Sequence, residues 1–427
     1  MSDLTRVQEW VFCLSRHRYG DMVRIPRSGA GSSVVGILLC AMSVQVALLA
    51  CSPPRLLTTR ELLTNTWRSY ERDFITTQGQ VLNPLAFSGW FRSEQVPHMQ
   101  TTSEGQAYAM LRAVSVGDHV VFDRVWRWTR EHLQVRPDHL FAWLWAPDQN
   151  DNWGVAGAGS ASDADEDVAL ALIFAGHRWH DPNYLFEARA ILDDIWRVEV
   201  VLNRGTYYLT AGDWAPGYGP GIVVNPSYLA PYAYRIFGEE DPGHPWTELA
   251  NSSYRALRAC TWALGTSEGV GLPPNWCLID RAHGGAAPFV TSDGDVYGYD
   301  AFRVMWRVAL DALWYHTPAA RRYLEDSDYL RRQWARHGWL AAEYHHDGTM
   351  AYKPWEDPSA YGANIGNFVV TDPRAALTLM QEKLIASYHS RDGVAYWGDR
   401  WNYYQQNWAW FGVALASGQV PNLAAAR

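Results

Sequence analysis

Helical periodicity dominates this chain from about Thr58 onward, and strand alternation is scarce. Apolar residues recur at spacings of three and four, as expected for helices with one buried face. The links between these stretches carry Gly, Pro, Asn and Asp, as in residues 215–221 and 271–275. The pattern predicts helices over 58–74, 103–116, 118–133, 164–179, 184–199, 226–237, 246–264, 301–315, 319–337, 373–388 and 402–417, with a short strand or hairpin within 279–298.

This number of helices of similar length predicts an all-α fold. No Ser/Gly linker or charge run divides the region, so we assign residues 58–420 to one domain. The pattern admits an α/α toroid, in which six inner helices are ringed by six outer ones. Periodicity alone does not separate that architecture from another large helical array.

Three acidic residues each lie where a predicted helix begins. Glu104 follows Ser103, whose Ser-x-x-Gln spacing is typical of a capping box, and Asp300 precedes Arg303 by one turn. Asp163 opens a run with four acids in the five positions 163–167. Each has an ordinary structural explanation, because an acid complements the helix dipole and an Asp–Arg pair at i,i+3 forms a salt bridge. The acidic run exceeds what a cap requires, and its spacing does not match a calcium loop.

Carboxylates that converge from distant segments are what hydrolysis of a glycosidic bond requires. One carboxylic acid protonates the leaving oxygen, and one carboxylate activates water or attacks carbon. An arginine one turn from Asp300 would keep that carboxylate ionised, as a general base requires. The sequence therefore predicts a polysaccharide hydrolase.

Charge and aromatic content bear on the substrate. The net charge is −9 with no Lys/Arg run in the globular region, so a nucleic-acid surface has no support. An acidic balance suits a neutral or cationic substrate and would repel an anionic glycan. The 23 Trp and 23 Tyr exceed what a core needs, although core packing is the commoner role for any single Trp. They favour an acidic, aromatic-lined cleft in which rings stack on sugar faces.

The N-terminus has the features of an export signal. Arg24 and Arg27 precede an apolar stretch, 34–49, which ends at a small residue followed by Cys51. Cysteine at this place resembles a bacterial lipoprotein box, so we expect a leader over 1–51 and a lipid anchor at Cys51. A retained anchor helix is the alternative, although the stretch is short for a membrane span.

Residues 1–21 are unlike a signal-peptide n-region, which makes Met22 an alternative start. Of the five cysteines, Cys260 and Cys277 remain in the globular region. In an exported protein they either form one disulfide or stay as two buried free thiols, and neither alternative is favoured. Their spacing does not resemble a metal site, and we expect neither metal nor cofactor.

Four segments resemble glycoside hydrolase family eight. The run 161–179, ASDADEDVALALIFAGHRW, is similar to the family signature, with Val168 where Ile or Met is usual. Residues 103–108 resemble the general-acid segment, although Ala109 stands where Gly is usual. Residues 299–304 resemble the segment that holds the general base in the subgroup with bacterial cellulases, and 225–231 resemble a further family segment. The four segments occur in the order that the family has, and the resemblance covers about residues 58–418.

The resemblance implies an (α/α)6 barrel, an inverting mechanism and β-1,4-linked glycans as substrates. It implies that Glu104 is the acid, that Asp300 is the base, and that Asp163 binds and distorts the sugar at the cleavage point. The tyrosine of segment 225–231 would help to hold the attacking water. The expected substrate-binding residues are Trp143, Trp214, Tyr228, Tyr299, Arg303 and Asp165.

We therefore hypothesise an exported endo-β-1,4-glucanase similar to the cellulases that accompany bacterial cellulose synthesis, with the synthase apparatus as an expected partner. The alternatives within this class are a chitosanase and, behind it, a xylanase or mixed-linkage glucanase. The alternative of a different class is a non-catalytic glycan-binding lipoprotein. Retention of all three acids argues against it, because binding alone needs no acid and base.

Overall fold

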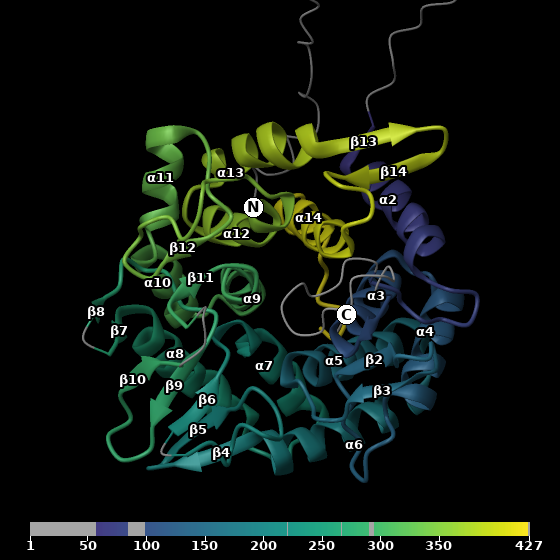
Figure 1. Ribbon diagram of the computed structural model, residues 1–427, viewed down its shortest axis with the longest axis horizontal. Coiled ribbons are helices and arrows are strands. Elements are labelled where there is room, and N and C mark those ends of the chain that lie inside the picture. The colour runs from purple at the N-terminus through teal and green to yellow at the C-terminus, as the bar shows by residue number, and fades with distance from the viewer. Residues whose placement is uncertain (1–56, 84–98, 220, 266, 290–293, 426–427) are drawn as a thin grey trace, which may run out of the picture. The chain divides into compact units, whose positions relative to one another are not determined.

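The computed structural model describes residues 57–83, 99–219, 221–265, 267–289 and 294–425 (Figure 1). These residues belong almost entirely to one compact unit, 59–427. The expected leader, 1–51, with Cys51 and the alternative start at Met22, lies outside the described residues. Among the helices that are described, none is long and apolar enough to cross a membrane.

Two sets of helices alternate along the unit. The helices of the first set follow one another around the middle of the unit (Figure 1). They are α3 (Ser103–Val116), α5 (Ser162–Trp179), α7 (Pro231–Glu240), α9 (Arg303–Tyr315), α12 (Pro358–Thr371) and α14 (Tyr403–Ala416). The second set lies outside them: α2 (Thr59–Phe74), α4 (His119–His132), α6 (Pro182–Glu199), α8 (Trp246–Trp262), α10 (Pro318–Asp326) and α13 (Pro373–Leu379). Arg112 of α3 donates to Asn407 of α14 at 3.0 Å and so links the last inner helix to the first.

This alternation confirms the (α/α)6 barrel. Each outer helix returns the chain, so the six inner helices run in the same direction and begin at the same end of the barrel. Inner helix α5 is buried all round over residues 162–176, as a helix inside a barrel must be. Outer helix α4 is amphipathic and buries one face, which includes Val121, Phe122 and Val125.

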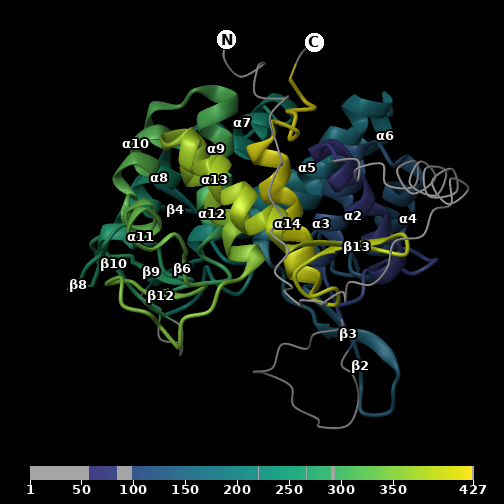
Figure 2. The same cartoon turned by 90° about the horizontal axis from the view of Figure 1, so that it is seen from above.

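Short strands lie where the chain enters the inner helices. Strands β1 (Thr101–Thr102), β2 (Leu144–Pro147) and β3 (Trp153–Gly157) form a sheet that leads into α3. Figure 2 shows the β2–β3 hairpin projecting from the helices. A second sheet has the order β6 (Gly221–Val224), β9 (Cys277–Asp280), β10 (Ala286–Pro288), β7 (Ala263–Leu264) and β8 (Ser267–Glu268).

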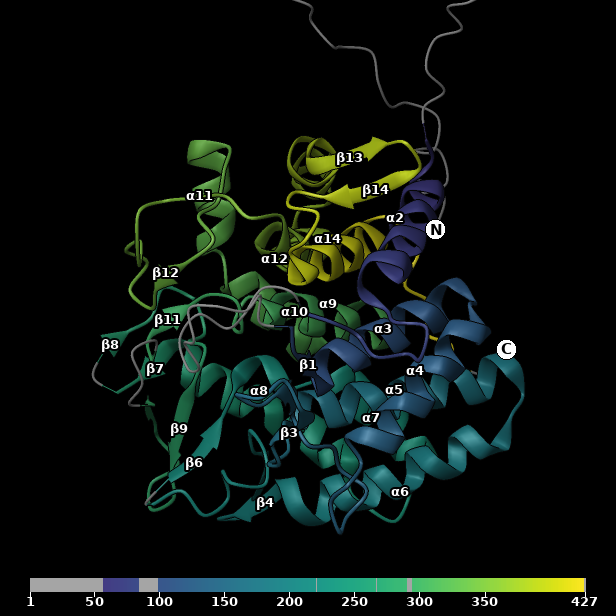
Figure 3. The ribbon, with the colours of Figure 1, turned by 45° about the vertical axis from the view of Figure 1, so that its right-hand side comes forward.

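Three two-stranded pairs complete the strands of the described residues: β4 (Val200–Asn203) with β5 (Thr206–Leu209), β11 (Val296–Tyr297) with β12 (Tyr344–His345), and β13 (Tyr388–Arg391) with β14 (Val394–Trp397). Figure 3 shows the β13–β14 hairpin beside α2, where the Ala395 amide donates to the Ser69 hydroxyl at 2.8 Å. The hairpin expected within 279–298 is present as β9 and β10, which pair antiparallel with Ala286 opposite Ile279.

Cys260 and Cys277 form a disulfide, which settles the choice that the sequence left open. Both residues are fully buried. The bond ties the end of outer helix α8 to the start of strand β9. The bond therefore fixes the start of β9, which precedes inner helix α9 in the chain.

Several of the helix boundaries predicted from the sequence were wrong. The stretch 226–237 is a 3-10 turn, η2 (Pro226–Tyr228), followed by α7, because Pro231 starts a helix better than it continues one. The stretch 319–337 divides into α10 and α11 (Tyr329–His337), and α9 begins only at Arg303. The stretch 373–388 is α13 followed by a π-helical turn, η3 (Met380–Leu384), and the 3-10 turn η4 (Ile385–Ser387).

Helix α12 was not predicted from the sequence. Its glycines discourage a helix prediction, because glycine is unfavourable in a helix interior. Here they allow close packing: a Cβ on Gly362 would lie 2.0 Å from the Trp408 carbonyl oxygen of α14, and one on Gly366 would lie 2.3 Å from that of Met305 in α9. Tertiary packing therefore overrides propensity in this helix.

Candidate active site

Arg303 gathers the three predicted acids at the N-terminal ends of the inner helices. Its Nη1 donates to Glu104 Oε2 at 2.9 Å and to Asp163 Oδ2 at 2.8 Å. Its Nη2 donates to Asp300 Oδ1 at 2.5 Å. Residues that are up to 199 positions apart in the sequence therefore share one guanidinium. We call Glu104, Asp163, Asp300 and Arg303 the acidic cluster.

Local structure at α3 places Glu104 in the first helical turn. The N-cap is Thr102, whose hydroxyl accepts from the Gly105 amide at 3.1 Å. The expected Ser103–Gln106 capping box does not form, because the Gln106 side chain is occupied elsewhere. Its Oε1 accepts from the Val81 amide at 2.6 Å and its Nε2 donates to the Thr129 hydroxyl at 2.7 Å. Gln106 thus anchors α3 to its neighbours, and Thr102 caps the helix in its place.

Asp163 and Asp300 reach Arg303 in different ways. Asp163 lies in the first turn of α5, where its Oδ1 accepts from the Ala164 amide at 2.9 Å. Asp300 lies in the turn before α9, and its carbonyl oxygen accepts from the Arg303 amide at 3.1 Å. The side chains of Glu104 and Asp300 are 22% and 32% exposed, whereas that of Asp163 is 3% exposed. A ligand at this end of the barrel can therefore reach Glu104 and Asp300 directly.

One cation does not offset three carboxylates that are held together. Burial raises the pKa of Glu104 above its ordinary range, against the opposing effects of Arg303 and a hydrogen bond from Tyr403. Burial also raises the pKa of Asp163 to about 7, and the nearby Glu104 charge contributes in the same direction. Desolvation and like charge both disfavour ionisation. The cluster is therefore built to hold a proton near neutral pH.

Tyrosines complete the surroundings of the cluster. The Tyr403 hydroxyl donates to Glu104 Oε1 at 2.6 Å, and the Tyr108 hydroxyl accepts from Arg303 Nη1 at 3.0 Å. The Arg303 guanidinium carbon lies 5.3 Å from the centre of the Tyr228 ring. Sequence reasoning assigned no role to Tyr108 or Tyr403. The sequence could have indicated Tyr108, because it lies one helical turn after Glu104. It could not have indicated Tyr403, which lies 299 positions from Glu104.

The other predicted binding residues lie in three different environments. Trp214 is 43% exposed and belongs to a ring group with Tyr218, Trp276 and Phe289, which we call the Trp214 group. Trp276 also contacts the Tyr228 ring, at 6.0 Å between centroids, and so joins this group to the acidic cluster. The Tyr299 hydroxyl donates to Asp357 Oδ2 at 3.0 Å. Trp143 is half-buried over Gly157, where a Cβ would lie 2.2 Å from its indole nitrogen.

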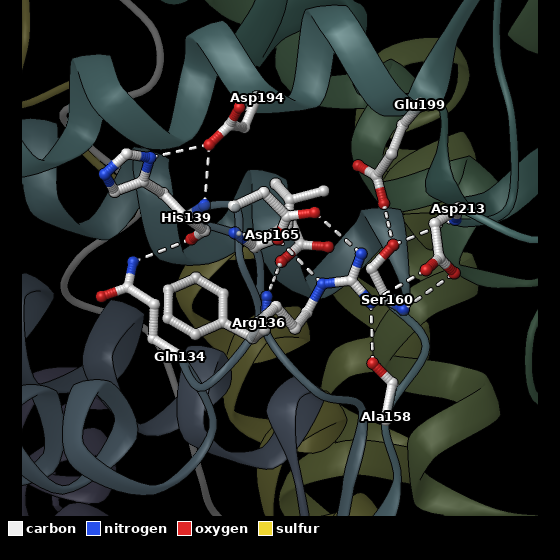
Figure 4. Close-up of polar contacts among 12 residues, drawn as sticks. Gln134, Arg136, His139, Ala158, Ser160, Asp165, Asp194, Glu199 and Asp213 are labelled. Atoms are coloured by element: carbon white, nitrogen blue, oxygen red, sulfur yellow. Dashed lines mark hydrogen bonds and ion pairs between the residues drawn. The ribbon is translucent and has the colours of Figure 1, made fainter.

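Asp165 lies apart from the acidic cluster, in a buried polar group that also contains Glu199 and Ser160 (Figure 4). It is fully buried, and its Oδ1 accepts from the Phe141 amide at 2.9 Å. Ser160 donates to Glu199 Oε1 at 2.5 Å, and burial raises the pKa of Glu199 to about 8. The structure gives Asp165 a contact with the backbone and no exposed surface for a sugar.

The rest of the acidic run is also buried. Asp167 pairs with Arg307 Nη2 at 2.8 Å, one helical turn below Asp163 and Arg303, and Glu166 is fully buried. Asp163 is therefore the member of the run that reaches the acidic cluster. Within the described part of the chain, no group of three or more His, Cys, Asp and Glu side chains is arranged to hold a metal ion.

One arginine holds three carboxylates at the N-terminal ends of the inner helices of an (α/α)6 barrel, Glu104 among them has a raised proton affinity, and exposed aromatic rings lie nearby. This arrangement is the one expected of a glycoside hydrolase. Comparison with known proteins identifies the family. The chain belongs to the glycosyl hydrolases of family 8, whose family model matches residues 39–330.

Curated relatives and solved structures agree with this family. Endoglucanase 2 of Ruminiclostridium josui is 33% identical over 270 residues, and an endoglucanase of Xanthomonas axonopodis pv. citri is 36% identical over 272 residues. The matched regions span 62% and 61% of this chain, but 53% and 63% of those proteins. The structure of an endo-β-1,4-glucanase from Acetobacter xylinum shares the fold, with a TM-score of 0.64, 22% identity, and coverage of 84% of this chain and 99% of that one.

Proposed function

We propose that the chain is an endo-β-1,4-glucanase that cleaves cellulose-like β-glucans with inversion of configuration. The observation that carries the proposal is the acidic cluster, in which one buried arginine holds three carboxylates of unequal exposure. Such a cluster separates an acid from a base by environment, which is how one site performs both tasks at the same pH. The relatives named as endoglucanases support the choice of β-glucan.

In this proposal Glu104 is the general acid. It donates its proton to the glycosidic oxygen as the bond to the anomeric carbon breaks, so the leaving chain departs with a hydroxyl group. The raised pKa of Glu104 supports this role, because a general acid must hold its proton at the working pH. The Tyr403 hydroxyl fixes the carboxyl by its bond to Oε1, which is the oxygen not bonded to Arg303.

Asp300 is the proposed general base. It accepts a proton from a water molecule whose oxygen attacks the anomeric carbon from the face opposite the leaving group. The contact with Arg303 Nη2 favours the ionised form that accepts this proton. Its side chain is the most exposed of the three acids, which leaves room for water beside it.

Asp163 is the proposed partner that binds and distorts the sugar at the cleavage point. Its depth in the barrel and its bond to Arg303 Nη1 suit a fixed acceptor for a sugar hydroxyl better than a group that exchanges protons with bulk water. Tyr228 is the proposed aid in holding the attacking water, because its ring lies against Arg303. Trp214 and its ring group are the proposed stacking surface for a sugar of the bound chain.

We further propose that the protein is exported and held at a membrane by lipid on Cys51. The buried disulfide supports export, because disulfides persist mainly in oxidising compartments. A role beside a cellulose synthase apparatus remains the proposed setting, in line with the cellulases that the sequence resembles.

The experiment is a release assay of reducing ends from soluble carboxymethyl cellulose, chitosan and xylan side by side. The proposal expects the fastest release from carboxymethyl cellulose, with a rapid fall in viscosity that marks cleavage within chains. Faster release from chitosan or xylan would move the substrate to that glycan. Binding without release from any of the three would favour the non-catalytic glycan-binding protein.

A further inference from the structure

We propose that Asn275 is a positioning residue for the general base, which it holds through the backbone turn that carries Asp300. The inference rests on the proposed role of Asp300. Asn275 lies in a link that the sequence marks only as a loop, between Pro274 and Trp276. Its side chain bonds backbone amides on both sides of Asp300, so we infer that it acts on the reaction through the backbone.

The contacts of Asn275 bracket Asp300. Its side-chain Oδ1 accepts from the Gly298 amide at 3.1 Å and from the Ala301 amide at 2.9 Å. These amides lie in the turn that precedes α9. Asn275 is 7% exposed, so water does not readily replace it. One carbonyl oxygen thus fixes the backbone on both sides of Asp300.

Asn275 is itself fixed to its surroundings. Its amide donates to the Val296 carbonyl oxygen at 2.6 Å, just before the Asp300 turn. Two residues later, Cys277 is linked covalently to Cys260 at the end of α8. The backbone of Asn275 is therefore bonded, and Cys277, two residues later, is cross-linked to α8. Through Asn275 the position of α8 can determine the position of the Asp300 turn.

The turn is held from its other side by α14. The Tyr404 hydroxyl donates to the Tyr299 carbonyl oxygen. There is also little space for the backbone to shift at Gly298, where a Cβ would lie 2.8 Å from Glu343 Oε1. Asp300 therefore sits on a turn that is bonded by Asn275 on one side and by Tyr404 on the other. Loss of the Asn275 bonds would release one side.

The consequence concerns turnover more than binding. The attacking water must lie in line with the leaving group, and a misplacement of about 1 Å can cost about 100-fold in rate. The Trp214 group and Asp163, which are the proposed sugar contacts, lie on other segments of the chain. A loosened Asp300 turn should therefore lower kcat and leave the affinity for glycan nearly unchanged.

The test compares Asn275→Ala with Asn367→Ala in the complete protein. Asn367 is the matched control, because it is fully buried and its side chain bonds the backbone oxygens of Leu324 and Ser327 and the sulfur of Met305, none of which belongs to the acidic cluster. Both variants should lose stability. For Asn275→Ala we expect kcat on soluble β-glucan to fall by about 10- to 100-fold with KM within about twofold, and for Asn367→Ala we expect kcat within about twofold of the wild type.

Asn275→Asp keeps an oxygen acceptor for the two amides and serves as the conservative variant should Asn275→Ala fail to fold. It should recover most of kcat, while its added charge near the base moves the acid limb of the pH profile of kcat upward. Unchanged kcat in Asn275→Ala, or an unmoved acid limb in Asn275→Asp, would overturn the positioning role. Absence of hydrolysis by the wild-type protein would instead overturn the proposed function.

Discussion

Asp163→Asn should stabilise the fold by an amount that grows as the pH rises from about 4 to about 7. Burial raises the pKa of Asp163 to about 7 in the folded protein, whereas an unfolded aspartate has a pKa of about 3.9. The folded state therefore binds the proton more tightly. The stability that this proton contributes is complete below about pH 4 and is lost as the pH rises through about 7.

The size of the effect follows from these two values. A gap of about three pH units between the folded and unfolded pKa corresponds to about 4 kcal/mol of unfolding free energy. The Asp163 side chain is 3% exposed, so solvent screening reduces this figure little. Because Asn mimics the protonated carboxyl, Asp163→Asn should gain up to about 4 kcal/mol at about pH 8 and less than about 1 kcal/mol at about pH 4.

The assay is urea denaturation of the wild-type protein and of Asp163→Asn at several pH values between about 4 and 9. The same variant should lose most of its hydrolysis, because the proposed sugar contact is removed. An equal gain at both ends of the pH range would mean that the substitution acts through packing. A variant that is less stable than the wild type at about pH 8 would contradict the raised pKa of Asp163.

Four further substitutions test other proposed roles. Glu104→Gln should lower hydrolysis by about 10²- to 10⁴-fold with glycan binding kept, and near-normal turnover would remove Glu104 from the mechanism. Glu199→Gln should flatten the loss of stability between about pH 5 and 8, because the wild-type protein loses stability as the pH rises from the ordinary glutamate pKa of about 4.5 to the Glu199 pKa of about 8; an unchanged slope would contradict this. Trp214→Ala should raise KM severalfold, whereas Phe186→Ala, which removes another exposed ring on α6, should not. Cys51→Ser should release the protein from membranes, and retention of an uncut chain there would favour an anchor helix.

The sequence alone predicted an all-α domain and the three acids because both leave local signals, whereas the (α/α)6 barrel was implied by the resemblance to the family. Helical periodicity appears in each segment separately, and each acid lies at the start of a helix or in the turn before it. Once the inner helices run in the same direction, their N-terminal ends meet and the acids meet with them. Arg303, as the i,i+3 partner of Asp300, was visible in the same way.

What the sequence did not reveal depends on packing between distant segments. The bridge from Arg303 to Glu104 and Asp163 requires three helices, and Tyr403 reaches Glu104 from the far end of the chain. Asp165 shares the acidic run with Asp163 but lies on a different side of α5. Because this part of α5 is buried on all sides, the spacing of its residues does not show which side faces the site. Helix α12 was missed for the related reason that its glycines serve contacts with other helices.

The stereochemistry of hydrolysis distinguishes the proposed inverting mechanism from a retaining one. If Glu104 is the acid and Asp300 is a base that activates water, the attack inverts the anomeric carbon and the first product of a soluble β-glucan is the α-anomer. Anomeric proton signals followed during the first turnovers distinguish the two outcomes before mutarotation mixes them. The account predicts an initial build-up of α-product. An initial build-up of β-product would mean that a carboxylate attacks the sugar directly, and it would contradict both the inverting mechanism and the role of Asp300.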